Sequence, residues 1–161
     1  MNKKEVHFEY EVYDSIEKLN TEDAALLDRA RKATATAYAP YSNFQVGASA
    51  LLLNGEMLNG TNQENASFPV GLCAERVLIS AISSLHPKTA IHTMAISYNN
   101  LNGKSDHPIS PCGICRQSLL EYESRLNHPI RLIMSGMDGE VFIIANAAML
   151  LPLRFTSEDM K

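Results

Sequence analysis

Apolar residues gather in short stretches that are typical of β-strands. Residues 46–53 are almost wholly apolar, as expected for a strand that is covered on both faces. Asn54-Gly55 follows as a strong hairpin signal, so the next strand should return antiparallel to the first. We predict strands at 46–53, 56–61, 91–97, 130–134 and 141–144.

The segments between these strands predict helices. Asn20 or Thr21 can cap the first one, which cannot continue through Pro40. A second helix over 73–85 should turn Val77, Leu78, Ile82 and Leu85 inward, a third should cover about 112–126, and a short helix should lie near 146–150. This order of helices and apolar strands predicts an α/β fold, a three-layer α/β/α domain with a mixed central sheet.

The N-terminal segment has a different pattern. Apolar Val6, Phe8, Tyr10 and Val12 alternate with polar residues, which is the period of a strand with one buried face. We interpret it as an added edge strand. A length of 161 residues, 45% of them hydrophobic, favours a single domain over 1–161, with 1–19 as an N-terminal extension.

Charge and targeting signals narrow the function classes. A net charge of −4 and a pI near 5.7 argue against a nucleic-acid partner, because such binding depends on Lys and Arg neutralising phosphates. The substrate should therefore be small and roughly neutral. The N-terminus has no basic start followed by an apolar run, and no stretch reaches membrane-spanning length, so we expect a cytoplasmic protein without a membrane partner.

The chain has three cysteines, and their spacing points to a metal site. Cys112 and Cys115 stand one helical turn apart, and Cys73 comes from the start of a second predicted helix. Thiols at helix N-termini have a lowered pKa, which favours the thiolate that binds metal. Three thiolates suit zinc and leave a fourth tetrahedral position open, as in catalytic sites. Glu75, two residues after Cys73, can reach that open position as a proton carrier.

The segments C-A-E-R at 73–76 and P-C-G-I-C-R-Q at 111–117 match the general pattern of zinc deaminases, in its all-cysteine variant. Two further blocks, Y-A-P-Y-S-N-F-Q-V-G-A at 38–48 and N-Q-E-N-A-S at 62–67, extend the match. The sequence from about Asn20 to Phe155 resembles the small, homotetrameric cytidine deaminases of pyrimidine nucleoside salvage. The resemblance implies a cytidine deaminase-like fold.

The resemblance also implies roles for individual residues. Asn62 and Glu64 would hold the ribose 3′-hydroxyl, and an amide beside a carboxylate does suit sugar hydroxyls. Phe155 would enter a neighbouring subunit's site and pack on the pyrimidine, and Phe44 would help to position the nucleoside. Arg76 would hydrogen-bond the cysteine thiolates and offset their charge. Phe68, where many relatives have tyrosine, and Leu153-Arg154 depart from the family pattern.

The reaction implied is the hydrolytic deamination of cytidine and deoxycytidine to uridine and deoxyuridine. One Zn²⁺ per subunit would activate water for attack at C4, while Glu75 carries its proton to N3 and then to the departing amine. The expected assembly is a homotetramer with shared active sites. Two alternatives remain at this stage: a related small-molecule aminohydrolase, such as a nucleoside-antibiotic deaminase, and a non-enzymatic zinc-binding protein.

Overall fold

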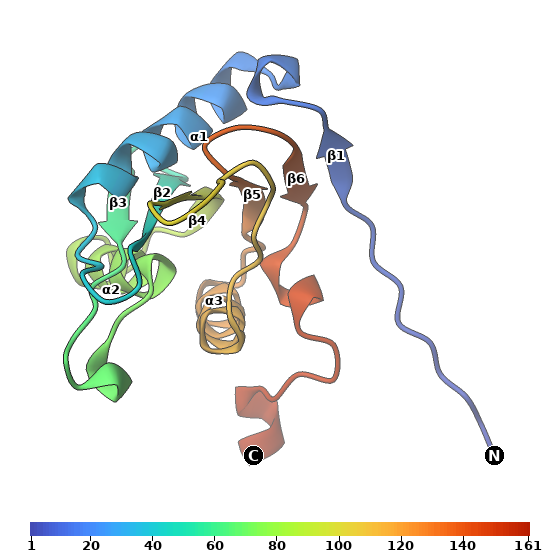
Figure 1. The fold of residues 1–161 in the computed structure, drawn as a ribbon. Helices are drawn as coiled ribbons and strands as arrows, with labels where there is room; N and C mark the ends of the chain where they lie inside the picture. The colour runs from blue at the N-terminus through green and yellow to red at the C-terminus, as the bar shows by residue number, and fades with distance from the viewer.

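A mixed sheet of six strands forms the centre of the protein in a computed structural model that describes residues 1–161 (Figure 1). The strand order is β1-β6-β5-β4-β2-β3, and β4 and β5 form the one parallel pair. The strands are β1 (Glu11–Tyr13), β2 (Phe44–Leu52), β3 (Met57–Thr61), β4 (Ile91–Asn100), β5 (Arg131–Ser135) and β6 (Val141–Ile144).

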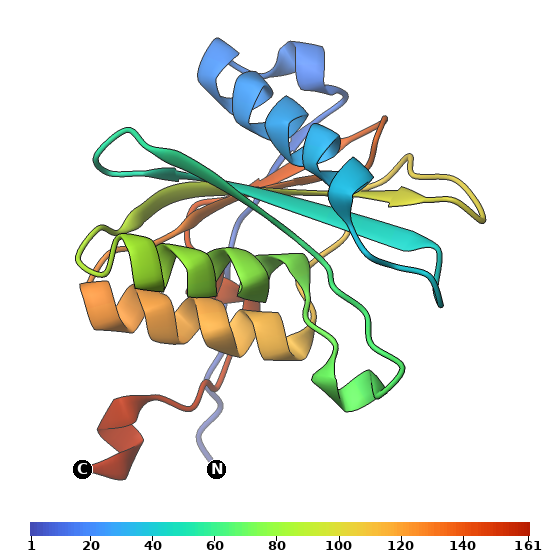
Figure 2. The same cartoon turned by 90° about the vertical axis from the view of Figure 1, so that its left-hand side faces the viewer.

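Helices cover both faces of this sheet. Helix α1 (Thr21–Ala33) lies on one face, and α2 (Ala74–Leu85) and α3 (Gly113–Leu126) run side by side on the other (Figure 2). This arrangement confirms the predicted three-layer α/β/α fold. Short 3₁₀ helices complete the chain: η1 (Ile16–Lys18), η2 (Thr34–Thr36), η3 (Phe68–Val70), η4 (Ala147–Leu150) and η5 (Ser157–Met160).

Strand β4 shows how the sheet supports two apolar layers. Successive side chains of a strand point to opposite faces. Met94 and Ile96 therefore belong to the large core under α2 and α3, while Ala95 belongs to the smaller core under α1. All three side chains are buried. A strand covered on both faces must be apolar at nearly every position, which explains why its sequence lacks a simple alternation.

A close approach between α2 and β3 fixes the N-terminal end of α2. A Cβ atom at Gly60 would lie 2.6 Å from the carbonyl oxygen of Ala74 and 2.7 Å from the Leu78 Cβ. Any larger residue at position 60 would push the first turn of α2 away from the sheet. Glycine here therefore determines where the residues just before Ala74 are placed.

Several local predictions need correction. Only β1 of the N-terminal segment is paired, as an edge strand on β6, and Val6, Phe8, Tyr10 and Val12 are exposed instead of half-buried.

The ends of the helices are partly as predicted. Helix α1 is capped by Asn20, whose side chain accepts a hydrogen bond from the Asp23 amide, as predicted. Leu85, expected to face inward, is exposed because it is the last residue of α2. No helix combines the length and the apolar character needed to span a membrane.

Candidate metal centre and active site

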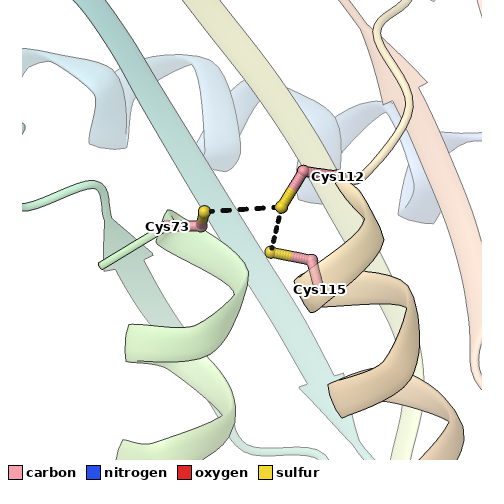
Figure 3. Close-up of side chains that lie close together, drawn as sticks. All are labelled: Cys73, Cys112 and Cys115. Carbon is pink, nitrogen blue, oxygen red and sulfur yellow. Dashed lines mark hydrogen bonds between the residues drawn. The ribbon is translucent and has the colours of Figure 1, made fainter. Parts of the chain in front are cut away.

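The three cysteines meet where the N-terminal ends of α2 and α3 lie next to each other. Cys73 is the N-cap residue of α2, Cys112 is the N-cap residue of α3, and Cys115 lies in the first turn of α3. Their side chains point toward one another (Figure 3). The first amide groups of a helix have no partner within the helix, so two sets of N–H dipoles converge on these sulfurs.

The spacing of the sulfur atoms suits a single tetrahedral ion. The Sγ atoms of Cys73 and Cys112 are 3.7 Å apart, and those of Cys112 and Cys115 are 3.5 Å apart. All three sulfurs lie within 4.8 Å of one another. Ligands at the usual zinc–sulfur distance of about 2.3 Å in tetrahedral geometry are about 3.8 Å apart. These distances exclude disulfides, whose sulfurs are about 2.0 Å apart, and fit a Zn²⁺ ion held by three thiolates.

The thiols differ in acidity because of their surroundings. The pKa of Cys73 is lowered to about 6, mainly by its interaction with the Cys115 thiol, with Cys112 and the positive charge of Arg76 contributing. The pKa of Cys115 is raised, because its proton is shared with Cys73 and because the side chain is buried. These surroundings favour the thiolate form of Cys73, which is the form that binds metal.

Glu75 lies beside the thiols in the first turn of α2 and is only 5% exposed. Burial raises the pKa of its carboxyl group. The side chain lines a cavity of about 320 Å³ together with Cys73 and Cys112. A carboxyl group with a raised pKa holds its proton more strongly than a free one, which suits it to carry a proton in general acid and base catalysis.

Asn62 and Glu64 line the same cavity, at the end of β3. The Asn62 side chain also fastens the beginning of β2, because its Oδ1 accepts from the Val46 amide at 2.7 Å and its Nδ2 donates to the Phe44 carbonyl at 2.8 Å. One N–H and one oxygen lone pair of the amide are left for another partner.

Glu64 is held by the loop before β2. Its Oε2 accepts hydrogen bonds from the amides of Tyr41 at 2.8 Å and Ser42 at 3.3 Å. The pKa of this carboxyl group is lowered, chiefly by hydrogen bonding with the Ser42 side chain. Glu64 is therefore a fixed, ionised hydrogen-bond acceptor, in contrast to Glu75. The two carboxyl groups of the cavity have environments that suit different tasks.

Three of the predicted site residues lie differently from the rest. Phe44 is not among the residues that line the cavity, and its ring stacks on Tyr98 with centroids 4.8 Å apart. Phe155 is 59% exposed and lies outside the cavity of its own chain. Arg76 makes no side-chain hydrogen bond with the thiols, although its charge acts on Cys73.

The cavity also contains residues that the sequence reasoning did not select. Leu72, Ile109 and Ser110 line it, and each lies within three residues of a cysteine ligand candidate. Adjacency to Cys73 and Cys112 is the signal that would have found them. Phe68, noted as a departure, also lines the cavity and is 74% exposed, with its ring edge-on to that of Tyr41.

A second cavity, of about 290 Å³, lies at the other end of α3. Glu123, His128 and Arg154 are among its lining residues, and none of the cysteines is. The chemistry of the molecule therefore lies in the first cavity, where thiols and a buried carboxyl group meet.

Thiol ligands on two helix N-termini, a carboxyl group beside them and a covered mixed sheet together define the class of zinc deaminases. Residues 20–127 match the family model described as the cytidine and deoxycytidylate deaminase zinc-binding region. The chain belongs to this family.

Similarity to individual proteins extends beyond the zinc-binding region. The chain is 33% identical over 135 residues to a cytidine deaminase of Halalkalibacterium halodurans, covering 84% of this chain and 95% of that protein. It is 39% identical over 109 residues to a cytidine deaminase of Mycobacterium tuberculosis, covering 66% and 77%. A crystal structure of cytidine deaminase from Burkholderia pseudomallei superposes with a TM-score of 0.71 at 33% identity, covering 81% of this chain and 97% of that one.

Proposed function

We propose that this protein catalyses the hydrolytic deamination of cytidine and deoxycytidine, giving uridine or deoxyuridine and ammonia. The observation that carries the proposal is a cluster of three thiols, of which Cys73 and Cys112 line one cavity together with a buried glutamate and two polar sugar-binding candidates. The similar proteins described above are cytidine deaminases, which favours this reaction over another aminohydrolase activity or a non-enzymatic zinc protein.

We assign Cys73, Cys112 and Cys115 as the ligands of one Zn²⁺ ion per chain. When bound, zinc supplies a Lewis acid that lowers the pKa of water to about 7. Three thiolates and Zn²⁺ sum to a formal charge of −1, which would weaken that effect. The two helix N-termini and the positive charge of Arg76 offset it, so we assign Arg76 an electrostatic role near Cys73.

Glu75 is assigned as the proton carrier. It takes a proton from the attacking water and delivers it to N3 of the pyrimidine, while the water oxygen forms a bond to C4. It then delivers the second proton of the water to the amino group, and the C4–N bond breaks with release of ammonia. The low exposure of Glu75 keeps bulk water from competing for these protons.

Asn62 and Glu64 are assigned to the sugar. The Oε1 atom of Glu64 has no partner in the chain and can accept a hydrogen bond from a sugar hydroxyl, while the remaining N–H of Asn62 can donate one. Phe44 would act on the nucleoside indirectly, because its ring stacks on Tyr98 outside the cavity and its carbonyl accepts the hydrogen bond that holds Asn62.

The assembly is proposed to be a homotetramer in which Phe155 packs on the pyrimidine of a neighbouring chain. Its exposure and its position outside its own cavity support a role in another subunit. Sedimentation equilibrium should give four times the chain mass of 17.8 kDa. A monomer with full activity would contradict the proposal.

The domain organisation is proposed to be a single domain with residues 1–19 as an extension. The family match begins at residue 20, and residues 1–10 make no backbone hydrogen bond to the rest of the chain. Val6 and Phe8 face a hollow that is shared with Leu151 and Pro152, so the extension packs beside the C-terminal segment. A chain lacking residues 2–9 should still unfold in one cooperative transition, and two separate transitions would refute a single domain.

The function itself is tested by following ultraviolet absorbance with cytidine, deoxycytidine, cytosine and cytidine monophosphate. Both nucleosides should be converted. Cytosine should react at least about a hundredfold more slowly in kcat/KM, because it lacks the sugar that Asn62 and Glu64 would hold. Stoichiometric zinc without turnover of any of the four would refute the proposed function.

A further inference from the structure

Two side chains that directly follow the last cysteine connect the metal-bearing end of α3 to the C-terminal segment, residues 150–155. Arg116 donates from Nε to the Pro111 carbonyl at 2.8 Å and from Nη1 to the Leu150 carbonyl at 3.0 Å. Gln117 donates from Nε2 to the Phe155 carbonyl at 3.0 Å. The guanidinium group of Arg116 therefore joins the peptide before Cys112 to the beginning of the C-terminal segment.

The hydrogen bonds from Arg116 and Gln117 matter for the C-terminal segment because its own backbone makes few. No backbone hydrogen bond involves residues 152–155. Leu153, between the two anchored carbonyls, is 99% exposed and has a φ of +55°, a left-handed conformation that costs a leucine about 1–2 kcal/mol. Such a conformation persists only where surrounding contacts impose it. Here the contacts on either side of Leu153 are made by Arg116 and Gln117.

Arginine is well suited to this task. Its guanidinium is planar, so two N–H groups hold two carbonyl oxygens at a fixed separation and direction. The side chain is half-buried, which limits competition from water. A lysine at this position could bond one carbonyl but could not fix both in one plane.

We propose that Arg116 is a positioning residue that sets where Phe155 stands relative to the metal centre, with Gln117 as the second anchor. This inference rests on the proposed function, in which Phe155 contacts the pyrimidine. One helical turn of α3 thereby provides two metal ligands and holds the segment that carries the aromatic contact. Loss of Arg116 loosens that segment and weakens binding of the nucleoside, while the proton transfers by Glu75 continue.

The test is steady-state kinetics of Arg116→Ala and Arg116→Lys with cytidine, using the zinc-loaded protein. We expect KM to rise about tenfold and kcat to change less than about twofold, because a binding contact is weakened and the reacting groups are untouched. Zinc content should remain that of the wild type. Arg125→Ala is the matched control, since Arg125 is on the same helix and bonds the Ser83 hydroxyl away from the segment.

A double-mutant cycle with Phe155→Ala tests whether the effect of Arg116 on KM is transmitted through Phe155. If Arg116 acts through Phe155, adding Arg116→Ala to Phe155→Ala should raise KM by less than about twofold. Independent, multiplying effects would overturn the proposal, and so would loss of zinc from Arg116→Ala, which would place its role at Cys112. If Arg116→Ala does not fold, Gln117→Ala takes its place in the cycle.

Hydrogen exchange of the Leu151 amide gives a readout that does not require activity, because this N–H donates to the Ala148 carbonyl and belongs to the same peptide group as the Leu150 carbonyl that Arg116 holds. Exchange should be at least about tenfold faster in Arg116→Ala than in the wild type or in Arg125→Ala. Unchanged exchange would overturn the positioning role. If the wild type fails to convert cytidine, the proposed function fails, and the exchange experiment still decides whether Arg116 holds the segment.

Discussion

Replacing Glu75 by glutamine is expected to lower kcat for cytidine by about a thousandfold while the protein keeps its zinc. Glutamine has the shape of glutamate but cannot take up and release a proton, and general acid and base groups contribute roughly 10²–10⁴-fold to rates. Glu75 would serve twice in one turnover, so we place the loss within the upper part of that range. The measurement is the fall in absorbance as cytidine is consumed, together with the metal content of both proteins.

The matched control for this substitution is Glu121→Gln. Glu121 is exposed on α3 and is not among the residues that line the cavity, so the same chemical change there should leave kcat and KM unchanged. The Glu75→Gln protein should also keep its thermal unfolding midpoint to within a few degrees, because the substitution conserves volume. A Glu75→Gln variant with the full wild-type rate would contradict the assigned proton transfers.

The fold was largely predictable because the apolar pattern and the turn residues act locally. The prediction of strand 141–144 matches β6, and the strand at 46–53 differs from β2 by only a few residues. The N-terminal segment was harder to predict. Alternation at Val6, Phe8 and Tyr10 is typical of pairing, yet pairing begins only at Glu11, where β6 is close enough to accept the chain. The alternation of apolar and polar residues in the N-terminal segment does not indicate how long its partner strand, β6, is.

The candidate site also contains features that the sequence predicts and features that it does not. Cys112 and Cys115 are placed together by the helical period, so their spacing alone indicated a shared ion. The position of Phe155 depends on two anchors, Arg116 and Gln117, and on the left-handed conformation of Leu153. No periodicity in the sequence specifies those contacts. The sequence therefore predicts which chemistry the site contains more readily than how the C-terminal segment is held.

Replacing Cys115 by serine is expected to remove the zinc and the activity together. Cys115 is fully buried between α2 and α3, and serine is a poor ligand for zinc. Zinc content should fall from about one per chain to near zero, and turnover should fall below detection. Ser118→Ala, one turn further along α3, changes a hydroxyl that bonds only the Ile114 carbonyl and is the matched control.

The Cys115→Ser variant should also lose a stabilisation that the metal gives to the wild type. A ligand present at a thousand times its Kd stabilises the folded state by about 4 kcal/mol. Treatment with a chelator should therefore lower the unfolding midpoint of the wild type, and the variant should not respond. A Cys115→Ser protein that still holds one zinc per chain would remove Cys115 from the ligand set.

The two substitutions are most informative when compared with each other. A purely structural zinc predicts that loss of zinc destabilises the protein and that Glu75→Gln has no consequence. A catalytic zinc predicts that Glu75→Gln keeps zinc and stability but loses turnover, whereas Cys115→Ser loses all three. Only the catalytic role separates the metal from the proton carrier in this way, because Glu75 lies beside the thiols without belonging to the three-sulfur cluster.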